Sequence, residues 1–495
     1  MMRHRIFTAL ILLWLGWQIA HPINLVEADL GRHIKNGELL LQGTTDILYK
    51  NFYSYTYPDY SFINHHWFFG VLCFLVWHCF GFTGLSSGYI VLQLLTFFIF
   101  LVLSKRYSSF LLSCAIGLLS IPLVALRYEI RPEGISMLLC GLCWLMLVKF
   151  QDQKLPGRYL KTGLAAVQVV WVNTHIFFIM GPIMVGLCWL QSRLDHQKEQ
   201  ARDLKLAFWL TAGACLINPS GLWGALTPFN IFKGLGLALI ENQSIIVMFK
   251  EFPHDRFFYY FVGTIVFMAI PWIILLRKEG VRRHVFLAGL MVLVSLCALK
   301  AVRMIGVYAY CWIPLSAYAW GKYLASWSKT SAEKAVRIFL IAGILSSAFI
   351  NFNWVQQPAL GLASGTNAPA EFLKSNHIQG PIFNNYTVGG YLIFHLSPSY
   401  KFFTDNRQEA FPPEFFKMTL EPMIFNEPAW LQKDTQYHFN AIVFARYPFE
   451  VRFLSRRAHD PAWALVFSDD QVAIFLRRNL QNAPVIQKYE IKRPS

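Results

Sequence analysis

Between residues 86 and 104 the chain reads SSGYIVLQLLTFFIFLVLS, without one charged side chain. A helix needs about 20 consecutive apolar residues to cross a bilayer, so this run predicts a membrane span. Other stretches have the same character, and the shorter ones would need tilt or flanking aromatic residues. They lie at about 6–22, 65–82, 108–126, 133–149, 160–173, 176–192, 205–218, 258–276, 285–299, 304–322 and 336–353.

The composition of the whole chain indicates a membrane protein. Its 495 residues are 55% hydrophobic and only 15% charged, whereas a soluble domain carries about 25% charged residues. Residues 1–353 hold 30 Lys/Arg against 16 Asp/Glu, and residues 354–495 hold 14 against 12. An excess of basic residues beside spans is typical of cytoplasmic loops. We therefore predict a lipid bilayer as a partner and no nucleic acid.

Clusters of basic residues predict which loops face the cytoplasm. The clusters lie at 149–161, 193–205, 277–283 and 322–337. If these loops are inside, alternation places the following segments outside: 127–133, 173–175, 218–257, 300–303 and the tail after residue 353. The N-terminus is then inside, and the first span stays uncleaved because no small-residue cleavage site follows Ala20. The alternation requires that 65–82 be juxtamembrane or re-entrant, which leaves about 11 spans.

The polar segments divide the chain into two predicted domains. Residues 1–353 form an all-α polytopic membrane bundle with an outer first loop at 23–64. Residues 354–495, the tail, predict a small extracytoplasmic α/β domain. Its strand-like stretches are Tyr391–Leu396, Ala441–Phe444 and Val472–Leu476, with a turn at Asp469-Asp470.

The first outer loop concentrates side chains that suit acid–base chemistry. It contains Glu27, Asp29, Arg32 and His33, and His65-His66 follow directly after it. If Asp29 begins a helix, Arg32 and His33 follow on its face at i+3 and i+4. A carboxylate beside a cation and an imidazole suits a general base that works on an anionic donor. The alternative is structural, because Asp is a favoured N-cap and a lone His is a common polar surface residue.

Charged residues also border later spans on the predicted outer side. Glu133 begins the span 133–149 directly after Arg131-Pro132, and Lys300 and Arg303 are spaced i, i+3. Ionisable groups at membrane depth are costly and indicate function. Glu133 is therefore a candidate second carboxylate, and Lys300 and Arg303 are candidate ligands of a lipid phosphate. The alternatives are complementation of a helix dipole by Glu133 and snorkelling of the basic side chains to headgroups.

Two further motifs lie in predicted turns. His175 ends the very short outer turn that begins at Asn173, and it either points into a cavity or merely ends a span. In the tail, Gly389-Gly390 precedes Asp405-Asn406-Arg407, and the glycines permit close backbone approach. No G-x-G-x-x-G or G-x-x-x-x-G-K motif follows, so nucleotide binding is not expected there.

Taken in order, these motifs resemble the GT-C superfamily of polytopic glycosyltransferases. The resemblance rests on the acidic first loop, Asp29 with Arg-His at helical spacing, and Arg-Pro-Glu at the start of a later span. The remaining motifs are Ser54-Tyr55-Thr56, His65-His66-Trp67, Asn173-Thr174-His175, Asn218-Pro219-Ser220-Gly221 and the tail segment from Asn384 to Tyr391 with the following Asp405-Asn406-Arg407. The similarity is to the bacterial branch that resembles protein mannosyltransferases and aminoarabinose transferases, and it extends over nearly the whole chain.

The resemblance implies that the chain transfers a sugar from a polyprenyl-phosphate donor to an acceptor at the outer face of the bacterial inner membrane. It implies Asp29 as the base, with Glu27 and Glu133 as further acids. The family pattern is often Asp-x-Asp, and Glu27-Ala28-Asp29 leaves the division of labour between the two acids open. Members differ in their need for a divalent metal ion, which Asp29 and Glu133 would bind here.

The same resemblance assigns roles to the basic residues and histidines. A cation would stabilise the departing lipid phosphate, with Arg131, Lys300, Arg303 and Arg32 as the candidates. Histidines would line the substrate pocket, and the candidates are His33, His65, His66 and His175.

Two other classes of function remain open at this point. A transporter or flippase for a lipid-linked sugar would show interrupted spans in two related halves and ionisable residues at mid-membrane. In this chain the polar residues concentrate at the outer ends of spans instead. A non-catalytic assembly partner would use the spans as an anchor, the tail for binding, and the acidic loop only as structure.

Overall fold

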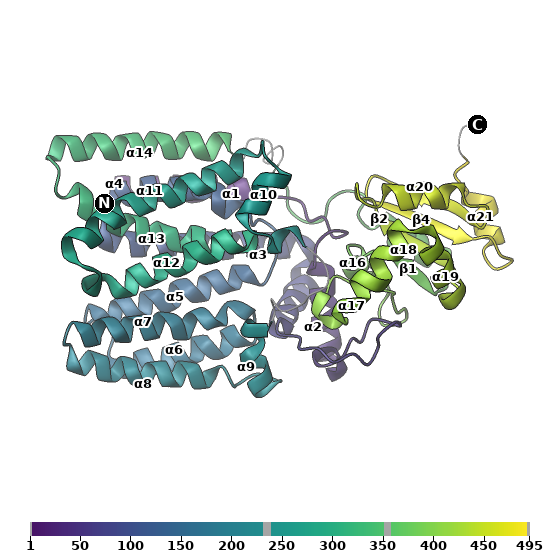
Figure 1. Ribbon diagram of the computed structural model, residues 1–495, viewed down its shortest axis with the longest axis horizontal. Helices are drawn as coiled ribbons and strands as arrows, with labels where there is room; N and C mark the ends of the chain where they lie inside the picture. The colour runs from purple at the N-terminus through teal and green to yellow at the C-terminus, as the bar shows by residue number, and fades with distance from the viewer. Residues whose placement is uncertain (1, 231–238, 351–357, 493–495) are drawn as a thin grey trace. The chain divides into compact units, whose positions relative to one another are not determined.

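The computed structural model describes residues 2–230, 239–350 and 358–492, and it is mostly helical with one small sheet (Figure 1). The chain forms two compact units. The bundle unit comprises Met1–His21, Ser86–Ala225 and Ala238–Leu360. The loop–tail unit comprises Pro22–Leu85, Leu226–Leu237 and Gly361–Ser495. The first loop is therefore grouped with the tail, whereas position along the sequence had placed it in the 1–353 domain.

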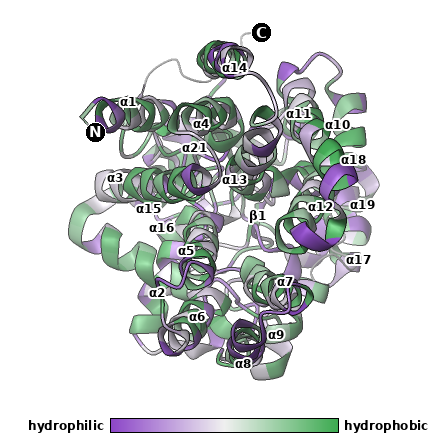
Figure 2. Cartoon of the chain, turned by 90° about the vertical axis from the view of Figure 1, so that its left-hand side faces the viewer, coloured by the Kyte–Doolittle hydropathy of each residue, from purple (hydrophilic) through white to green (hydrophobic). Residues whose placement is uncertain are grey.

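The bundle unit consists of apolar helices lying side by side (Figure 2). Its helices are α1 (Met2–Ile19), the second part of α3 (Trp67–Tyr107), α4 (Phe110–Ala125), α5 (Glu133–Gln151), α6 (Gly157–Val172), α7 (Met180–Leu194), α8 (Lys198–Ala214), α10 (Ile245–Glu251), α11 (Arg256–Glu279), α12 (Val285–Lys300), α13 (Ile305–Leu324) and α14 (Lys329–Phe349), while α9 (Gly221–Asn230) crosses the unit boundary. Short 3-10 turns lie at Ile176–Ile179, Ile240–Asn242, Val281–His284 and Val302–Met304.

Helix α4 is buried along most of its length. Every residue from Leu112 to Ala125 is buried, as expected of a helix that is apolar on all sides. It packs against α13 and α14. A Cβ atom at Gly343 of α14 would lie 2.8 Å from the Cβ of Leu118. The glycine therefore permits the close approach of α14 to α4.

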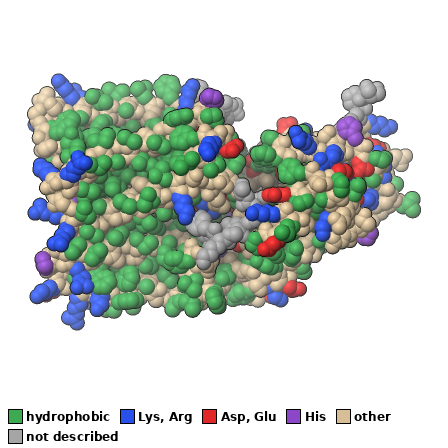
Figure 3. All heavy atoms as spheres, viewed as in Figure 1, with side chains coloured by type: hydrophobic (Ala, Val, Ile, Leu, Met, Phe, Trp, Pro, Cys, Tyr) green, Lys and Arg blue, Asp and Glu red, His purple; other side chains and the backbone are tan. Residues whose placement is uncertain are grey.

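Large apolar side chains cover much of the face of the bundle unit that Figure 3 shows. Leu13, Trp209 and Ile338 are each at least 60% exposed, and so much apolar surface indicates contact with lipid. Five described helical segments are long and apolar enough to cross a membrane, judged by length and composition: Trp67–Tyr107, Glu133–Gln151, Ile176–Leu194, Arg256–Glu279 and Val281–Lys300. The chain thus has the character of a multi-pass membrane protein.

Helix α3 consists of two helices joined at a kink. Gly81 has φ 63° and ψ −165°, a conformation that glycine adopts far more readily than other residues. The residues before Ser86 belong to the loop–tail unit, and those from Ser86 onward belong to the bundle unit. The break comes at the end of the 65–82 stretch that the sequence excluded from the spans.

Ion pairs link several of the basic loops at one end of the bundle unit. Arg106 Nη2 lies 2.5 Å from Asp152 Oδ1, and Lys161 Nζ lies 2.7 Å from Asp203 Oδ1. In Figure 3, Lys and Arg side chains gather at the left-hand end of the bundle. The grouping follows the predicted alternation of loops, and the assignment of this end to the cytoplasm stays a prediction.

The loop–tail unit contains a four-stranded mixed sheet in the order β1-β2-β4-β3. Strand β1 (Ile382–Asn384) pairs in parallel with β2 (Ala441–Ala445) in the register Ile382 to Ala441. Strand β4 (Val472–Arg477) is antiparallel to both β2 and β3 (Trp463–Ser468). The helices of this unit are the first part of α3, α2 (Leu30–Leu41), α15 (Ala368–Ser375), α16 (Gly389–Leu396), α17 (Pro413–Phe415), α18 (Glu421–Phe425), α19 (Glu427–Tyr437), α20 (Val451–His459) and α21 (Ala483–Tyr489), with short turns at Thr45–Leu48, Gln408–Ala410 and Phe416–Leu420.

The α/β character of the tail and two of its strands are as predicted, and a third predicted strand is wrong. The sequence Tyr391–Leu396 forms helix α16 instead of a strand. Its residues Tyr391, Leu392 and Ile393 are fully buried, and a short run that is apolar on every side carries no periodicity to separate strand from helix. The two glycines at its start allow the helix to approach the chain near Asp405 closely, because a Cβ at Gly389 would lie 2.4 Å from the Asp405 Cα.

Aromatic residues of the first loop complete the core of the tail. Phe62 packs in a buried cluster with Phe383 and Phe403. The hydroxyl of Tyr55 donates to the carbonyl of Ile382 over 2.9 Å, and Thr56 Oγ1 donates to the carbonyl of Phe403 over 2.9 Å. The Ser-Tyr-Thr motif therefore fastens the first loop to the tail.

A buried ion pair adds to this attachment. Arg407 is 1% exposed, and its Nη2 lies 2.7 Å from Asp405 Oδ2 and 2.8 Å from Asn51 Oδ1. Asn51 comes from the first loop, whereas both charged residues come from the tail. Because removal of one partner leaves the other charge buried, such pairs are costly to break.

We expect Arg407→Met to lower the free energy of unfolding by about 3–5 kcal/mol, because it leaves the Asp405 carboxylate buried without its cation. Thermal unfolding of the purified protein in detergent, followed by tryptophan fluorescence, measures the change. Arg478→Met is the matched control, since Arg478 pairs with Glu490 near the surface and exposed pairs contribute under about 1 kcal/mol. Equal melting temperatures for the two variants would contradict the expectation.

Candidate functional site

The first-loop site consists of Asp29, Arg32 and Asn406. Asp29 directly precedes α2, yet its side chain makes no hydrogen bond to the amides of the first turn. Instead, Asn406 Nδ2 donates to Asp29 Oδ1 over 2.5 Å, and Arg32 Nε donates to Asn406 Oδ1 over 2.8 Å. Arg32 Nη2 lies 3.9 Å from the same Asp29 oxygen. One amide thus bridges a carboxylate and a guanidinium, and the capping interpretation does not describe Asp29.

Exposure differs sharply between the two charged groups of this site. The side chain of Asp29 is 29% exposed and that of Arg32 only 6%. The carboxylate therefore remains accessible while its neighbours fix its position, which is the arrangement a proton acceptor needs. Glu27 is the exposed residue of a turn whose other residues, Leu25 and Val26, are buried. Its side chain makes no hydrogen bond or ion pair with any residue the structure describes.

Close helix packing brings Asn406 to Asp29. A Cβ at Gly31 of α2 would lie 2.9 Å from the Phe394 Cβ of α16, and a Cβ at Gly390 would lie 2.6 Å from Asn406 Nδ2. Both positions therefore require glycine for this approach. The sequence singled out the glycine pair and the following Asp-Asn-Arg, but it gave Asn406 no role because an amide carries no charge signal.

Three of the predicted pocket histidines lie together where α2 meets the start of α3. The ring centroids of His33 and His66 are 5.6 Å apart, and those of His65 and His66 are 3.9 Å apart. His33 and His65 are buried. The helices touch at their backbones, since a Cβ at Gly37 would lie 2.2 Å from the carbonyl oxygen of Gly70. These histidines are packed between helices, and their role in lining a substrate pocket stays a prediction.

The carboxyl ends of the parallel strands β1 and β2 adjoin the first-loop site. Asn385, just after β1, donates from Nδ2 to the carbonyl of Ala445 over 2.9 Å and to Glu450 Oε1 over 3.2 Å. The hydroxyl of Tyr386 donates to the carbonyl of Asn406 over 3.0 Å. Ligands of open α/β sheets commonly bind beyond the carboxyl ends of parallel strands. Burial raises the pKa of Glu450 to about 7.

The bundle unit contains a second polar group, the arginine cluster, in which three guanidinium groups surround Glu241. Glu241 Oε2 lies 2.9 Å from Arg131 Nη1 and 3.8 Å from Arg127 Nη1, and Oε1 lies 3.0 Å from Arg303 Nη2. Burial acts to raise the pKa of Glu241, but Arg303, Arg131 and Arg127 outweigh it and bring that pKa to about 2. The cluster therefore holds an ionised carboxylate.

Glu133 adjoins the arginine cluster. It begins α5, as predicted, and it forms an ion pair with Arg127. His175 Nε2 lies 4.0 Å from Glu133 Oε2, and the Nδ1 of the same ring lies 2.9 Å from Ser136 Oγ. Glu133, Arg127 and Arg303 line a narrow cavity of about 20 Å³, which is room for about one water molecule.

Most of the predicted residues lie in two parts of the structure. Asp29, Arg32 and the three histidines belong to the loop–tail unit. Arg131, Arg303, Glu133 and His175 meet in the bundle unit, where they join predicted outer loops. Sequence reasoning missed Glu241 and Arg127, which lie in turns without a recognisable motif. Lys300 ends α12 with an exposed side chain, and it forms no hydrogen bond or ion pair within the described residues.

Two expectations about the acids stay predictions. Asp29 and Glu133 belong to different compact units, so their predicted convergence in one cavity is not tested. No group of three or more His, Cys, Asp or Glu side chains within residues 2–230, 239–350 and 358–492 could hold a metal ion. Asp29 has Arg32 beside it and Glu133 has Arg127, so each carboxylate already faces a cation.

Comparison with solved structures shows which proteins share the fold of this chain. The archaeal oligosaccharyltransferase AglB from Archaeoglobus fulgidus, in complex with an inhibitory peptide and a dolichol-phosphate, matches with a TM-score of 0.60 and 9% identity over 89% of this chain and 69% of that chain. ArnT from Cupriavidus metallidurans bound to undecaprenyl phosphate matches with a TM-score of 0.53 and 13% identity over 96% and 98%.

A further match is the Archaeoglobus fulgidus oligosaccharyltransferase in complex with Zn and sulfate. Its TM-score is 0.58, with 10% identity over 95% of this chain and 73% of that chain. At such low identities the similarity concerns the fold. No protein-family model and no curated protein sequence matches the chain.

The raised pKa of Glu450 predicts a specific pH dependence of stability. The carboxyl has a pKa of about 7 in the folded protein, against an ordinary value of 4.5. The folded state therefore binds this proton more tightly, and the stability that the protonated form gives is lost as the pH rises from 4.5 through 7. We expect Glu450→Gln, which keeps the protonated shape, to melt like the native protein at pH 4.5 and to be more stable at pH 8 by up to about 3 kcal/mol.

Thermal unfolding at several pH values measures this difference between the variant and the native protein. Glu490→Gln is the matched control, because a hydrogen bond from Arg478 lowers the pKa of Glu490. The difference in melting temperature between Glu490→Gln and the native protein should stay constant between pH 5 and 8. A constant difference for Glu450→Gln as well would contradict the prediction.

Proposed function

We propose that this protein is an integral-membrane glycosyltransferase that transfers a sugar from a polyprenyl-phosphate donor to an acceptor at the outer face of the membrane. Two fold neighbours support the donor class, since AglB was solved with a dolichol-phosphate and ArnT with undecaprenyl phosphate. The observation that carries the proposal is the accessible Asp29 carboxylate, fixed by Asn406 with Arg32 behind it.

In this proposal Asp29 is the catalytic base. The acceptor hydroxyl attacks the anomeric carbon of the donor sugar, and its proton passes to the Asp29 carboxylate. The bond between that carbon and the phosphate oxygen breaks, and the phosphate leaves with the electron pair. Asn406 and Arg32 are positioning residues, because they hold Asp29 and are themselves largely shielded from solvent. The exposed Glu27 is a secondary acid.

The arginine cluster supplies the site for the lipid phosphate. Arg131 and Arg303 already bind the carboxylate of Glu241 at 2.9 and 3.0 Å, and guanidinium groups bind phosphate oxygens with the same charge-assisted geometry. Negative charge grows on the leaving phosphate in the transition state, so fixed cations act where charge develops. Lys300 is a further cation for the same phosphate, and Glu133 holds Arg127 in place.

The proposal includes a topology and a location. The chain makes about 11 crossings of a bacterial inner membrane, with the N-terminus inside and the tail outside. The salt bridges among basic loops and the gathering of Lys and Arg at one end of the bundle unit support this sidedness. The proposed reaction steps use no metal ion, because the guanidinium groups beside Asp29 and Glu133 would repel a second cation.

We expect Asp29→Asn to reduce sugar transfer by about a hundredfold or more, because the amide cannot accept the proton. The amide retains an oxygen that can accept the hydrogen bond from Asn406, so the fold should persist. Transfer from radiolabelled polyprenyl-phosphate sugars to membrane extract measures the loss, and the melting temperature checks folding. Asp59→Asn, at an exposed first-loop carboxylate, is the matched control. Full activity of the Asp29 variant would remove the assignment.

We expect Arg303→Gln and Arg131→Gln each to lower kcat/KM for the lipid-linked donor roughly tenfold to a hundredfold, since each deletes one charge-assisted contact to phosphate. Initial rates at varied donor concentration measure the effect. Arg283→Gln is the matched control, because it removes an exposed positive charge from one of the predicted cytoplasmic loops. Equal losses in all three variants would mean that general charge, and not the arginine cluster, governs donor binding.

A further inference from the structure

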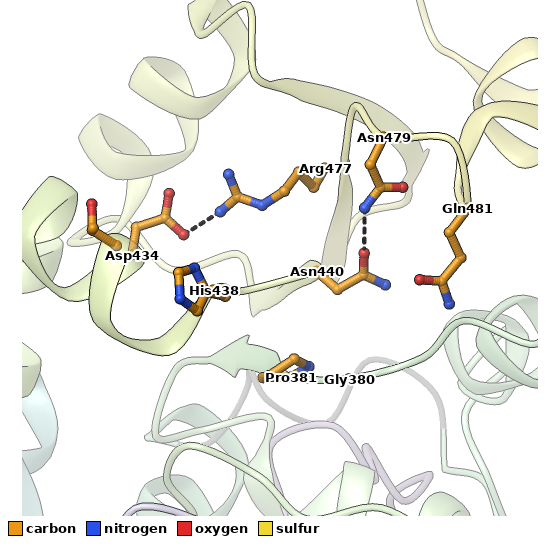
Figure 4. Close-up of a pocket in the computed structure, with 9 residues that line it drawn as sticks. Gly380, Pro381, Asp434, His438, Asn440, Arg477, Asn479 and Gln481 are labelled. Atoms are coloured by element: carbon orange, nitrogen blue, oxygen red, sulfur yellow. Dashed lines mark hydrogen bonds and ion pairs between the residues drawn. The ribbon is translucent and has the colours of Figure 1, made fainter.

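A second polar pocket, of about 500 Å³, lies in the loop–tail unit at the amino ends of the parallel strands (Figure 4). Gly380-Pro381 precedes β1, Asn440 precedes β2, and Arg477 ends the antiparallel strand β4. The first-loop site adjoins the carboxyl ends of β1 and β2. The pocket is therefore a separate site at the opposite ends of the same parallel strands. Its volume lies in the range of small-molecule sites.

The charges in this pocket neutralise each other. Arg477 forms an ion pair with Asp434 of α19, as Figure 4 shows, and its Nε donates to the carbonyl of Phe439 over 2.5 Å. The guanidinium carbon lies 4.6 Å from the ring centroid of Trp463. The pair of one guanidinium and one carboxylate leaves this part of the pocket without net charge, so charge does not favour an anionic ligand over a neutral one.

Amide side chains form much of the remaining wall. Asn479 Nδ2 donates to Asn440 Oδ1 over 3.0 Å, and the buried Asn482 donates to the same oxygen over 2.9 Å. These bonds hold the wall rigid. The side chains of Gln481 and His438 face the pocket (Figure 4), and they form no hydrogen bond within the part of the chain that the structure describes.

The chemistry of this lining selects a class of ligand. Amide, carboxylate and guanidinium groups together offer both donors and acceptors, and sugar hydroxyls both donate and accept. A peptide would need apolar anchoring pockets, whereas Pro381 is the one apolar side chain among the lining residues described. We propose that this pocket binds a neutral saccharide, and, resting on the proposed function, that the saccharide is part of the acceptor glycan.

The test is binding of the full-length protein, labelled and in detergent, to a printed array of neutral and acidic bacterial glycans. We expect neutral glycans to bind. Thr435→Trp places a bulky ring in the pocket and should abolish that binding. Gln481→Ala should weaken it roughly tenfold, because it deletes hydrogen bonds to the ligand without touching the core. Gln432→Trp introduces the same ring on an exposed position of α19 outside the lining and should leave binding unchanged.

Several outcomes would overturn the inference. They are binding that survives in Thr435→Trp, a preference for acidic glycans, and the absence of any glycan signal from the native protein. Melting temperatures show whether each variant is folded, and Gln481→Ala supplies a second readout if Thr435→Trp is not. Glycan binding by Asp29→Asn on the same array tests the saccharide site apart from the proposed catalytic role of Asp29. Pocket-dependent binding in a native protein without transferase activity would refute the proposed function and leave the saccharide site standing.

Discussion

The carboxylate of Asp29 is held by an amide 377 positions further along the chain, and this contact depends on the close packing of α2 against α16. Glycine at Gly31 and Gly390 removes the side chains that would keep those helices apart. Around them, first-loop aromatics such as Phe62 complete the tail core. The position of the proposed base is thus set by packing between two distant segments, and a change in that packing would move the carboxylate without altering its chemistry.

The arginine cluster rests on a different constraint, the matching of charge where water is scarce. Arg127 and Arg131, from the connection between α4 and α5, and Arg303, from the turn Val302–Met304, would repel one another if left alone. Glu241, together with Glu129 and Glu133, supplies the anions that let them gather. In the proposed function, a phosphate oxygen takes the place of the Glu241 carboxylate between Arg131 and Arg303. Stability and the proposed donor recognition therefore draw on one set of contacts in the bundle unit.

Sequence patterns predicted the features that depend on local chemistry. The helix start at Glu133, the helix after Asp29 and the close approach at the Gly389-Gly390 pair all follow from short-range rules. The helix α16 was missed because its residues are buried on every side, and Asn406 and Glu241 were missed because their importance comes only from distant partners. The predicted domain boundary near residue 353 did not take account of the attachment of the first loop to the tail. The convergence of Asp29 and Glu133 stays a prediction.

The attachment of the first loop to the tail has a consequence for biogenesis. A ribosome completes residues 22–85 long before it reaches Gly361, so the loop must wait, with Phe62 and Asn51 unpaired, through synthesis of the helices in between. The tail, which is synthesised last, then packs against the first loop, which was synthesised early. A fragment expressed from residue 354 onward would lack part of its own interior, and we expect it to aggregate.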